Sequence, residues 1–285
     1  MMIKILICAL AFVLVTSDLS SAECNEYWIS YERPHPRPNP RPRPNPQPRP
    51  QPRPHPEPQP EDPQPELKPS VSHTKDVCRL STCQGKPNTE CLFRDYTPSA
   101  NCGRVMTVGL STEEKKAIVD LHNELRMKVA RGQERRGAPG PQPPATDMQT
   151  LEWDEELAQT AQKWASQCIF QHDQCRDLPR FQVGQNLAWR GNTSKQGFSQ
   201  ITAEILVKDW YDEVQYYNRN SVHYFNSLYG AGGQTGHYTQ LVWAKTNRIG
   251  CGAIRNYQGG YYKFTLACNY GPAGNFMNRP VYRTR

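Results

Sequence analysis

Proline occupies every second position from Pro34 to Pro60. Each proline lacks an amide donor and fixes its own φ angle, so this segment can form neither a helix nor an interior strand. We expect an extended polyproline II rod, about 80 Å long at ~3.1 Å per residue. The interleaved residues are mostly basic at first and acidic later. We interpret the rod as a spacer for a folded domain, and the alternative is a ligand for a proline-binding or acidic partner.

The chain begins with an apolar run from Ile5 to Val15. This run is too short for a transmembrane helix, which needs ~20 residues, and fits the core of a secretory signal peptide. Small residues at Ser20 and Ala22 predict cleavage after Ala22. No other stretch is long or apolar enough to cross a membrane. We therefore expect a signal peptide at 1–22, a proline-rich tail at 23–77, a domain at 78–285, and an extracellular location.

The sequence contains 10 cysteines, and Cys8 would leave with the signal peptide. The rest would meet an oxidising compartment, which favours disulfides over free thiols or zinc ligands. The absence of any CxxC pair agrees with this. After Cys8 is removed the number of cysteines is odd, so one of them lacks a partner within the chain.

The formal net charge of +7 specifies no partner by itself. Lysine and arginine are scattered, without an arginine-rich helix or an aromatic and basic RNA motif. Nucleic-acid binding is therefore not expected. Asn192-Thr-Ser194 is a sequon, and we expect an N-glycan on Asn192.

Three helices are expected in the globular part. Ser111-Thr-Glu-Glu114 is a capping box that begins the first helix, and Gly132 ends it. A proline-rich loop follows. The second helix comes after Asp154, and the third runs from about Ser199 to Tyr217. The apolar stripe of the first helix is Ile118, Leu121, Leu125 and Val129. That of the second is Leu157, Ala161, Trp164, Ala165 and Cys168, and that of the third is Ile201, Ile205, Trp210, Val214 and Tyr217.

The last third of the chain is rich in β-branched and aromatic residues. Strands are expected at Tyr238 to Trp243, Ile249 to Arg255 and Tyr261 to Cys268, with a hairpin loop at Asn256 to Gly260. Cys251 and Cys268 would face each other across this hairpin. Early helices and late antiparallel strands predict an α+β domain in which helices cover the sheet.

Four segments occur together in the order His122-Asn-Glu-Leu-Arg126, Gly184-Gln-Asn-Leu187, Gly236-His-Tyr-Thr-Gln-Leu-Val-Trp243 and Cys268-Asn-Tyr-Gly-Pro-Ala-Gly-Asn275. In this order they resemble the motifs of the CAP superfamily, which contains cysteine-rich secretory, antigen 5 and PR-1 proteins. The cysteine order is most similar to the venom allergen 5 (antigen 5) branch in arthropods. This resemblance implies an α-β-α sandwich from Cys78 to the C-terminus.

The resemblance also implies a pairing of the cysteines, which spacing alone does not decide. The implied bridges are Cys78–Cys91, Cys83–Cys175, Cys102–Cys168 and Cys251–Cys268. Cys24 would then be the residue left over. It could join two chains in a disulfide-linked dimer, or it could be removed by processing or capped by a small thiol.

CAP domains have a central cleft lined by two histidines and two acidic residues, and some members bind zinc there. The matching residues are His172, His237 and Glu213, with Gln185 in place of the second acid. Two imidazoles and a carboxylate form a legitimate Zn²⁺ ligand set, which the loss of one acid would weaken. No cofactor is required, and the alternative is a hydrogen-bonded polar cleft without metal. By contrast, His122 lies on an apolar stripe and is interpreted as structural.

The function that this resemblance implies is that of a secreted, non-enzymatic binding or effector protein of venom or saliva. Its target would be a host protein or a small lipid. One alternative is an endopeptidase that uses His172, Glu213 and His237, although the sequence has neither a GxSxG elbow nor an HExxH helix. A lesser alternative is lipid or sterol binding between helices. Asn123 and Arg126 are expected to tie the first helix to neighbouring loops.

Overall fold

The computed structural model describes residues 2–7, 25–30 and 77–285. The chain divides into two units, Met1–Glu66 and Leu67–Arg285. The first unit contains one antiparallel strand pair, β1 (Met2–Ile7) with β2 (Asn25–Ser30). The expected cleavage site after Ala22, Cys24 and the alternating prolines lie outside the described residues.

The second unit is built on one five-stranded sheet with the order β3-β8-β9-β5. These strands pair antiparallel, and β4 adds a short parallel pairing to β8. The β8–β9 hairpin turns on Gly259 and Gly260, whose φ angles of 58° and 83° suit the tight turn that matches strand twist. The sheet strands are β3 (Arg104–Val108), β4 (Glu152–Trp153), β5 (Gly184–Asn192), β8 (Arg248–Gln258) and β9 (Tyr261–Gly271). A separate pair consists of β6 (Tyr229–Gly230) and β7 (Gly233–Gln234).

The helices begin where the sequence offers caps. Ser111 N donates to Glu114 Oε2 at 2.9 Å and Glu114 N donates to Ser111 Oγ at 3.2 Å, which confirms the capping box. Asp154 caps the second helix by accepting from the amide of Leu157 at 3.0 Å. The α-helices are α2 (Thr89–Leu92), α3 (Thr112–Ala130), α4 (Glu155–Ala165), α5 (Lys195–Phe198), α6 (Ala203–Asp212) and α7 (Gly236–Leu241). The 3₁₀ turns are η1 (Ser81–Cys83), η2 (Ala100–Cys102), η3 (Glu213–Tyr216) and η4 (Arg219–Val222).

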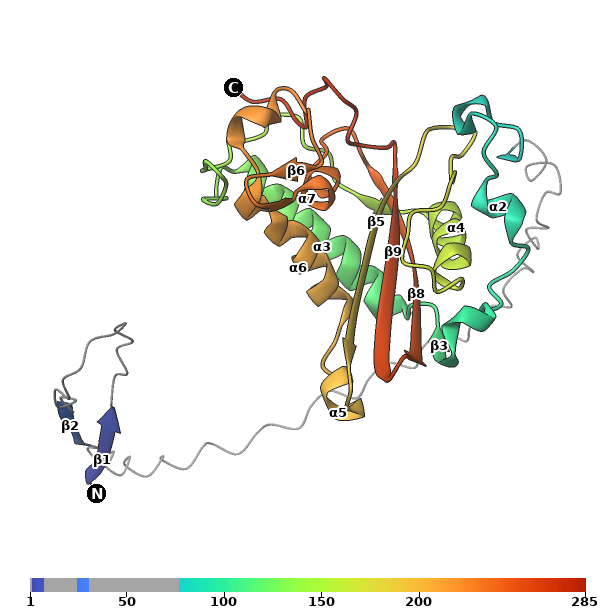
Figure 1. Ribbon diagram of the computed structural model, residues 1–285. Helices are drawn as coiled ribbons and strands as arrows, with labels where there is room; N and C mark the ends of the chain where they lie inside the picture. The colour runs from blue at the N-terminus through green and yellow to red at the C-terminus, as the bar shows by residue number, and fades with distance from the viewer. Residues whose placement is uncertain (1, 8–24, 31–76) are drawn as a thin grey trace, which may run out of the picture. The chain divides into compact units, whose positions relative to one another are not determined.

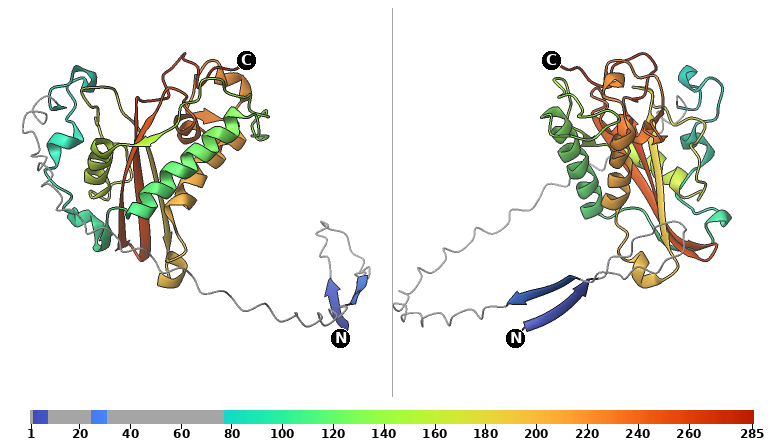
Figure 2. Two further views of the ribbon diagram at one scale, coloured as in Figure 1. Left: turned by 180° about the vertical axis from the view of Figure 1, so that it is seen from behind. Right: turned by 60° about the vertical axis from the view of Figure 1, so that its left-hand side comes forward.

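The elements form three layers, which confirms the expected α+β sandwich. Figure 1 shows α4 against one face of the sheet and α3 and α6 against the other, and both views of Figure 2 agree. Helix α4 approaches β8 closely because Gly250 and Gly252 have no side chain. A Cβ on Gly252 would overlap the backbone of Gln162 in α4. Glycine in β8 therefore sets the distance between this helix and the sheet.

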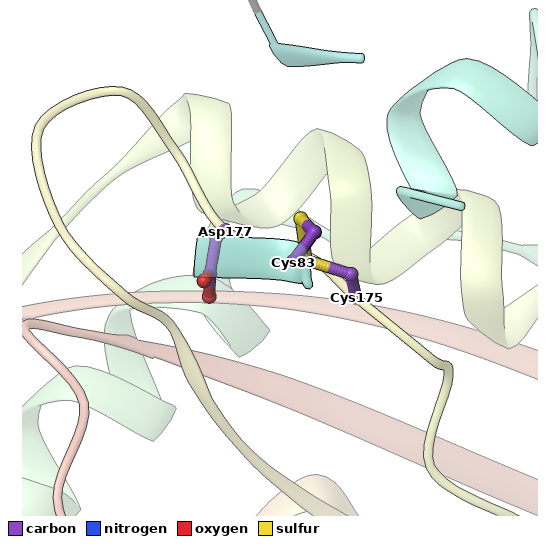
Figure 3. A group of neighbouring side chains, drawn as sticks. All are labelled: Cys83, Cys175 and Asp177. Carbon is purple, nitrogen blue, oxygen red and sulfur yellow. A yellow bond between two sulfur atoms is a disulfide. The ribbon is translucent and has the colours of Figure 1, made fainter. Parts of the chain in front are cut away.

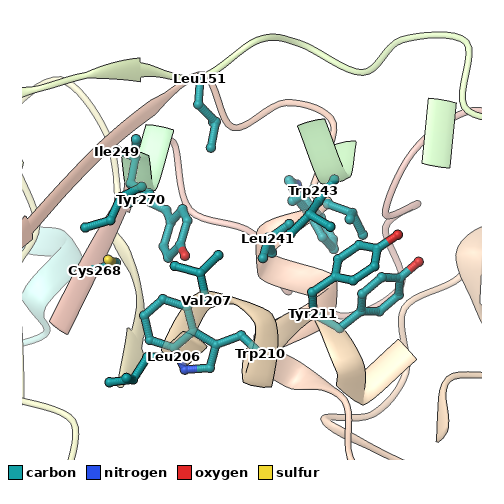
Figure 4. Close-up of a cluster of buried hydrophobic side chains, with 14 of the residues drawn as sticks. Leu151, Leu206, Val207, Trp210, Tyr211, Leu241, Trp243, Ile249, Cys268 and Tyr270 are labelled. Atoms are coloured by element: carbon teal, nitrogen blue, oxygen red, sulfur yellow. The ribbon is translucent and has the colours of Figure 1, made fainter. Parts of the chain in front are cut away.

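The largest apolar cluster lies between the sheet and the α3–α6 layer. Trp210 of α6 is 1% exposed and belongs to one cluster with side chains from α3, α7, β8 and β9. Figure 4 shows those from α7, β8 and β9 around it. Burial of an aromatic side chain of this size contributes several kcal/mol to the folded state, on the order of 25 cal/mol per Å². The members that Figure 4 labels are Leu151, Leu206, Val207, Trp210, Tyr211, Leu241, Trp243, Ile249, Cys268 and Tyr270.

Four disulfides cross-link the domain, and they are the pairs that the resemblance implied. They are Cys78–Cys91, Cys83–Cys175, Cys102–Cys168 and Cys251–Cys268. Cys251 and Cys268 are directly opposite residues of the β8–β9 ladder, with Cα atoms 4.1 Å apart. Two other bridges attach the segment before α3 to Cys168 and Cys175, which flank His172.

Helix α3 is anchored to the loops around it, as expected. Asn123 donates from Nδ2 to Leu151 O at 2.9 Å and accepts from Leu151 N at 2.8 Å. Arg126 is 1% exposed and donates only to backbone carbonyls. Its acceptors are the carbonyl oxygens of Gln149, Leu241, Trp243, Ala244 and Thr246.

The strand expected at Tyr238 to Trp243 is wrong, because Gly236–Leu241 is helix α7. Nearly every side chain from Tyr238 to Trp243 is buried, so the segment has no polar face that would show a helical period. Side chains from other parts of the fold form hydrogen bonds with the backbone groups at both ends of the helix. Glu213 accepts from its first amides, and Arg126 takes carbonyls at and beyond its last turn.

Two other expectations need correction. The third helix is not continuous from Ser199 to Tyr217, since α6 covers Ala203–Asp212 and a 3₁₀ turn follows. The hairpin loop is shorter than expected, because β8 continues to Gln258 and β9 begins at Tyr261. Strands β3 and β5 were not expected. Strand β5 carries glycine and asparagine, which are uncommon in strands.

Candidate functional site

Glu213 and His237 form a hydrogen-bonded pair where η3 meets α7. Glu213 Oε1 lies 2.6 Å from Nδ1 of His237. Its other oxygen accepts from the amides of His237 at 3.0 Å and of Tyr238 at 3.2 Å. The same carboxylate therefore orients the imidazole of His237 and caps the first turn of α7. With the proton on Nδ1, the lone pair of His237 is on Nε2.

His172 is held from the opposite side by Gln185 of β5. Nδ1 of His172 lies 2.8 Å from Oε1 of Gln185, and Gln185 Nε2 donates to Oδ1 of Asn269 at 3.1 Å. Asn269 in turn donates to the carbonyl of Leu157 at 3.3 Å. Because Oε1 only accepts, Nδ1 of His172 must donate, which leaves Nε2 unprotonated in the neutral ring.

The electrostatics keep His172 neutral near pH 7. Partial burial lowers its pKa below 6.5, and the positive potentials of Arg176 and His237 lower it further. The hydrogen bond to Gln185 and the charge of Asp173 oppose this shift. Asn186, which follows Gln185 in β5, donates to the carbonyl of His237 at 3.1 Å and so links the two histidine pairs. The structure thus brings together His172, Gln185, Glu213 and His237, a group called the histidine site below.

The histidine site has the donor chemistry of a metal centre with two ligands. Each imidazole has Nδ1 fixed by an oxygen acceptor and Nε2 left as a ligand atom, the arrangement in which outer partners orient metal-binding histidines. Both oxygens of Glu213 accept hydrogen bonds from the residues at the start of α7, and one of them orients His237. The expected ligand set of His172, His237 and Glu213 stays a prediction.

A trio of residues outside the histidine site has ligand atoms within 4.8 Å of one another, which His172, Glu213 and His237 do not. In the described part of the chain, this group is Cys83, Cys175 and Asp177 (Figure 3). Its two sulfurs are bonded to each other, so neither is the thiolate that binds metal. The amide of Val183 donates to Asp177 Oδ1 at 2.8 Å, so this carboxylate supports the loop before β5.

His122 is a buried structural residue, as expected. It is 0% exposed, with Nδ1 2.7 Å from Ile118 O and Nε2 2.9 Å from the hydroxyl of Tyr270. Burial lowers its pKa to about 4, and the neighbouring charge of Arg126 also lowers it, against the hydrogen bond to Ile118. His122 is therefore neutral at pH 7 and does not belong to the histidine site.

Asn186 links this buried histidine to the site. Its Nδ2 donates to the carbonyl of His237 at 3.1 Å and to the hydroxyl of Tyr270 at 3.3 Å. Sequence reasoning gave no role to Asn186, Asn269 or Tyr270. All three residues lie in two of the matched motifs, which begin at Gly184 and at Cys268. The pairing of Gln185 with Asn269 across β5 and β9 brings these two motifs together. Two motifs far apart in the sequence thus form one side of the site.

Asn192 lies at the end of β5, beside Thr193 and Ser194 at the surface. Its Oδ1 accepts from the amide of Ser194 at 2.8 Å. The expected glycan on Asn192 stays a prediction.

Residues 119–270 match the cysteine-rich secretory protein family, CAP. Venom allergen 5 of Vespula flavopilosa is 45% identical over 212 residues, which cover 74% of this chain and 100% of that protein. The venom allergen 3 homolog of Dinoponera quadriceps is 46% identical over 214 residues, which cover 74% of this chain and 90% of that protein.

Solved structures agree with this relationship. BmVAL-1 has 29% identity and a TM-score of 0.54, covering 62% of this chain and 84% of its own. NaASP2, solved with Zn²⁺, has 28% identity and a TM-score of 0.50, and the match covers 66% of this chain and 90% of NaASP2. In the part of the chain that the structure describes, no helix is long and apolar enough to cross a membrane. The matched motifs, the four disulfides and these similarities show that the chain belongs to the CAP family and is similar to venom allergen 5 proteins.

Proposed function

We propose that this CAP protein is a secreted, non-enzymatic binding or effector protein of venom or saliva, with a host protein as its target. Its disulfides suit an extracellular protein. The rigid domain would present the histidine site and the surrounding loops to the target. The proline-rich segment would act as a spacer that keeps the domain accessible.

The observation that carries this proposal is the incomplete catalytic geometry of the histidine site. The Glu213–His237 pair resembles the orienting half of a catalytic triad. Among the described residues, no serine or threonine hydroxyl is hydrogen-bonded to His172 or His237, and each cysteine from Cys78 to Cys268 is in a disulfide. An activated nucleophile would need such a contact.

A peptidase assay tests this against the enzymatic alternative. The purified, oxidised chain is incubated with a broad peptide library, beside His237→Ala and Glu213→Ala. We expect no turnover by any of the three proteins, and specific retention of a tissue protein by the immobilised wild type. Cleavage by wild type that both variants lose would overturn the proposal. Cleavage that survives in both variants would identify a contaminating peptidase.

The site would bind Zn²⁺ weakly through Nε2 of His172 and of His237. The zinc-bound NaASP2 structure and the fixed Nδ1 partners support this. An acid at Gln185 would add one negative charge, worth about 2 kcal/mol beside a divalent ion at ~4 Å even at the dielectric of water. Calorimetry should therefore show about thirtyfold tighter zinc binding in Gln185→Glu. Equal heats for wild type, Gln185→Glu and His237→Ala would exclude the site.

A hollow of about 470 Å³ favours lipid binding as a second candidate function. Met106, Phe198 and Ile201 supply apolar lining. Two cations and two acids also line the hollow, and one pair of them, Arg255 and Glu114, forms a salt bridge; these residues are Lys195, Arg255, Glu114 and Glu204. The aromatic residues of α6 and η3 are core instead, since Trp210 and its neighbours are buried. Ile201→Glu should reduce binding of a long-chain fatty acid several-fold by calorimetry, and unchanged affinity would exclude this hollow.

A further inference from the structure

The geometry points to a second ligand site, separate from the histidine site, that takes a small apolar carboxylic acid. It is a pocket of about 290 Å³ formed mainly by the segment that follows β9. It shares no residue with the histidine site. Its lining residues are Asp147, Trp243, Ala244, Lys245, Pro272, Ala273, Phe276, Arg279, Pro280, Val281, Tyr282 and Arg283.

The body of the pocket is apolar and rigid. Trp243 is only 3% exposed, and Phe276 packs edge-on against it with ring centroids 6.3 Å apart. The segment after β9 is tied down, because Ala244 N donates to Val281 O at 2.8 Å and Ala273 N donates to Gln182 O at 2.8 Å. A pocket that is formed before binding requires little ordering of the protein, which favours affinity.

The volume limits the size of the ligand. An engineered apolar cavity of about 150 Å³ binds benzene. A pocket of about 290 Å³ therefore has space for an aromatic ring with a short alkyl chain. This size excludes a long fatty acid, whose tail would extend into water.

The charges at the pocket select an acid. Lys245, Arg279 and Arg283 are exposed cations, and Asp147 is the one carboxylate among the lining residues. Asp147 is already engaged, by Lys245 Nζ at 3.2 Å and by the amide of Arg283 at 2.8 Å. Among the described residues, neither Arg279 nor Arg283 has an ion pair through its guanidinium group. Guanidinium groups bind carboxylates through paired, charge-assisted hydrogen bonds.

The apolar walls, the volume and the charges of the pocket together determine which ligand it would bind. The ring of the ligand would lie against Trp243 and Phe276, and its carboxylate would reach Arg279 or Arg283. The net positive charge disfavours amines, and the apolar walls disfavour small hydrophilic acids such as acetate. An aryl-alkyl carboxylate combines both requirements.

Isothermal titration calorimetry with 4-phenylbutyrate tests this proposal on the full, oxidised chain. The uncharged 4-phenylbutan-1-ol measures the contribution of the carboxylate. We expect saturable binding of the acid, with the alcohol at least tenfold weaker. Absence of saturable binding at millimolar 4-phenylbutyrate would overturn the site.

Variants assign the binding to this pocket. Ala273→Phe should abolish binding by filling the pocket, and Arg279→Gln with Arg283→Gln should weaken the acid tenfold without changing the alcohol. Arg285→Gln removes one positive charge outside the pocket and should leave binding unchanged. Because the two arginines are exposed, their replacement provides a readout even if Ala273→Phe fails to fold. Acid binding that survives the double arginine variant, or that Ile201→Glu abolishes, would refute this assignment.

Discussion

The replacement of Arg126 by methionine isolates the stabilising role of one buried cation. Methionine has nearly the same length but cannot donate a hydrogen bond. Within the described part of the chain, Arg126 has no carboxylate partner and donates to five backbone carbonyls. Burial lowers its pKa to about 9, so the side chain is still charged at pH 7. The variant therefore removes both the charge and all the hydrogen bonds that this side chain donates to the loop after α7.

The expected loss follows from these contacts. A hydrogen bond to a charged group contributes about 1.5–3 kcal/mol, but the carbonyls can relax and the buried charge is relieved. We take about 1 kcal/mol for each of the five carbonyls, which gives about 4–5 kcal/mol. For a domain of this size, 1 kcal/mol shifts the melting temperature by about 2–4 °C, so the variant should melt about 8–20 °C lower.

Thermal unfolding followed by circular dichroism at pH 7 measures this loss in the oxidised protein. Arg131→Met is the matched control, because Arg131 is exposed at the end of the same helix and should shift the melting temperature by no more than about 2 °C. If Arg126→Met melts within 2 °C of Arg131→Met, the carbonyl contacts of Arg126 contribute little. The reasoning from its hydrogen bonds would then be refuted.

Two further predictions concern His122 and Gly252. The pKa of His122 is lowered to about 4 in the folded state, so unfolded chains bind more protons between pH 6.5 and 4. Stability should fall by up to about 3 kcal/mol as the pH drops through this range and level off below it. Urea unfolding at pH 7 and 4.5 would measure this, and an equal pH dependence in His122→Asn would contradict it. Gly252→Ala would force α4 from the sheet and should cost about 1–3 kcal/mol; an unchanged melting temperature would show that the helix can shift freely.

The sequence predicted the fold class and the three longest helices, α3, α4 and α6, because their signals are local. The capping box at Ser111 and the apolar stripe of α3 are properties of short segments, and the structure confirms both. Helix α7 could not be predicted this way. Its ends are satisfied by Glu213 and Arg126, which lie far away in the sequence, and its buried side chains conceal the helical period.

The histidine site could be predicted only in outline. Motif resemblance named His172, Gln185, Glu213 and His237, and the structure brings them together. The role of Glu213 could not be predicted, because it depends on the direction in which a side chain from η3 meets the amides of α7. The role of Asn269 could not be predicted for a similar reason, since its contact with Gln185 exists only once β5 pairs with β9.

The two bridges that flank His172 make the site dependent on the oxidation state of the protein. Cys168 and Cys175 attach both ends of this loop to the segment before α3, through Cys102 and Cys83. Reduction would release the loop at both ends, and His172 would lose its fixed position opposite His237. Material prepared in a reducing cytoplasm should therefore be oxidised and refolded before its ligands or targets are sought.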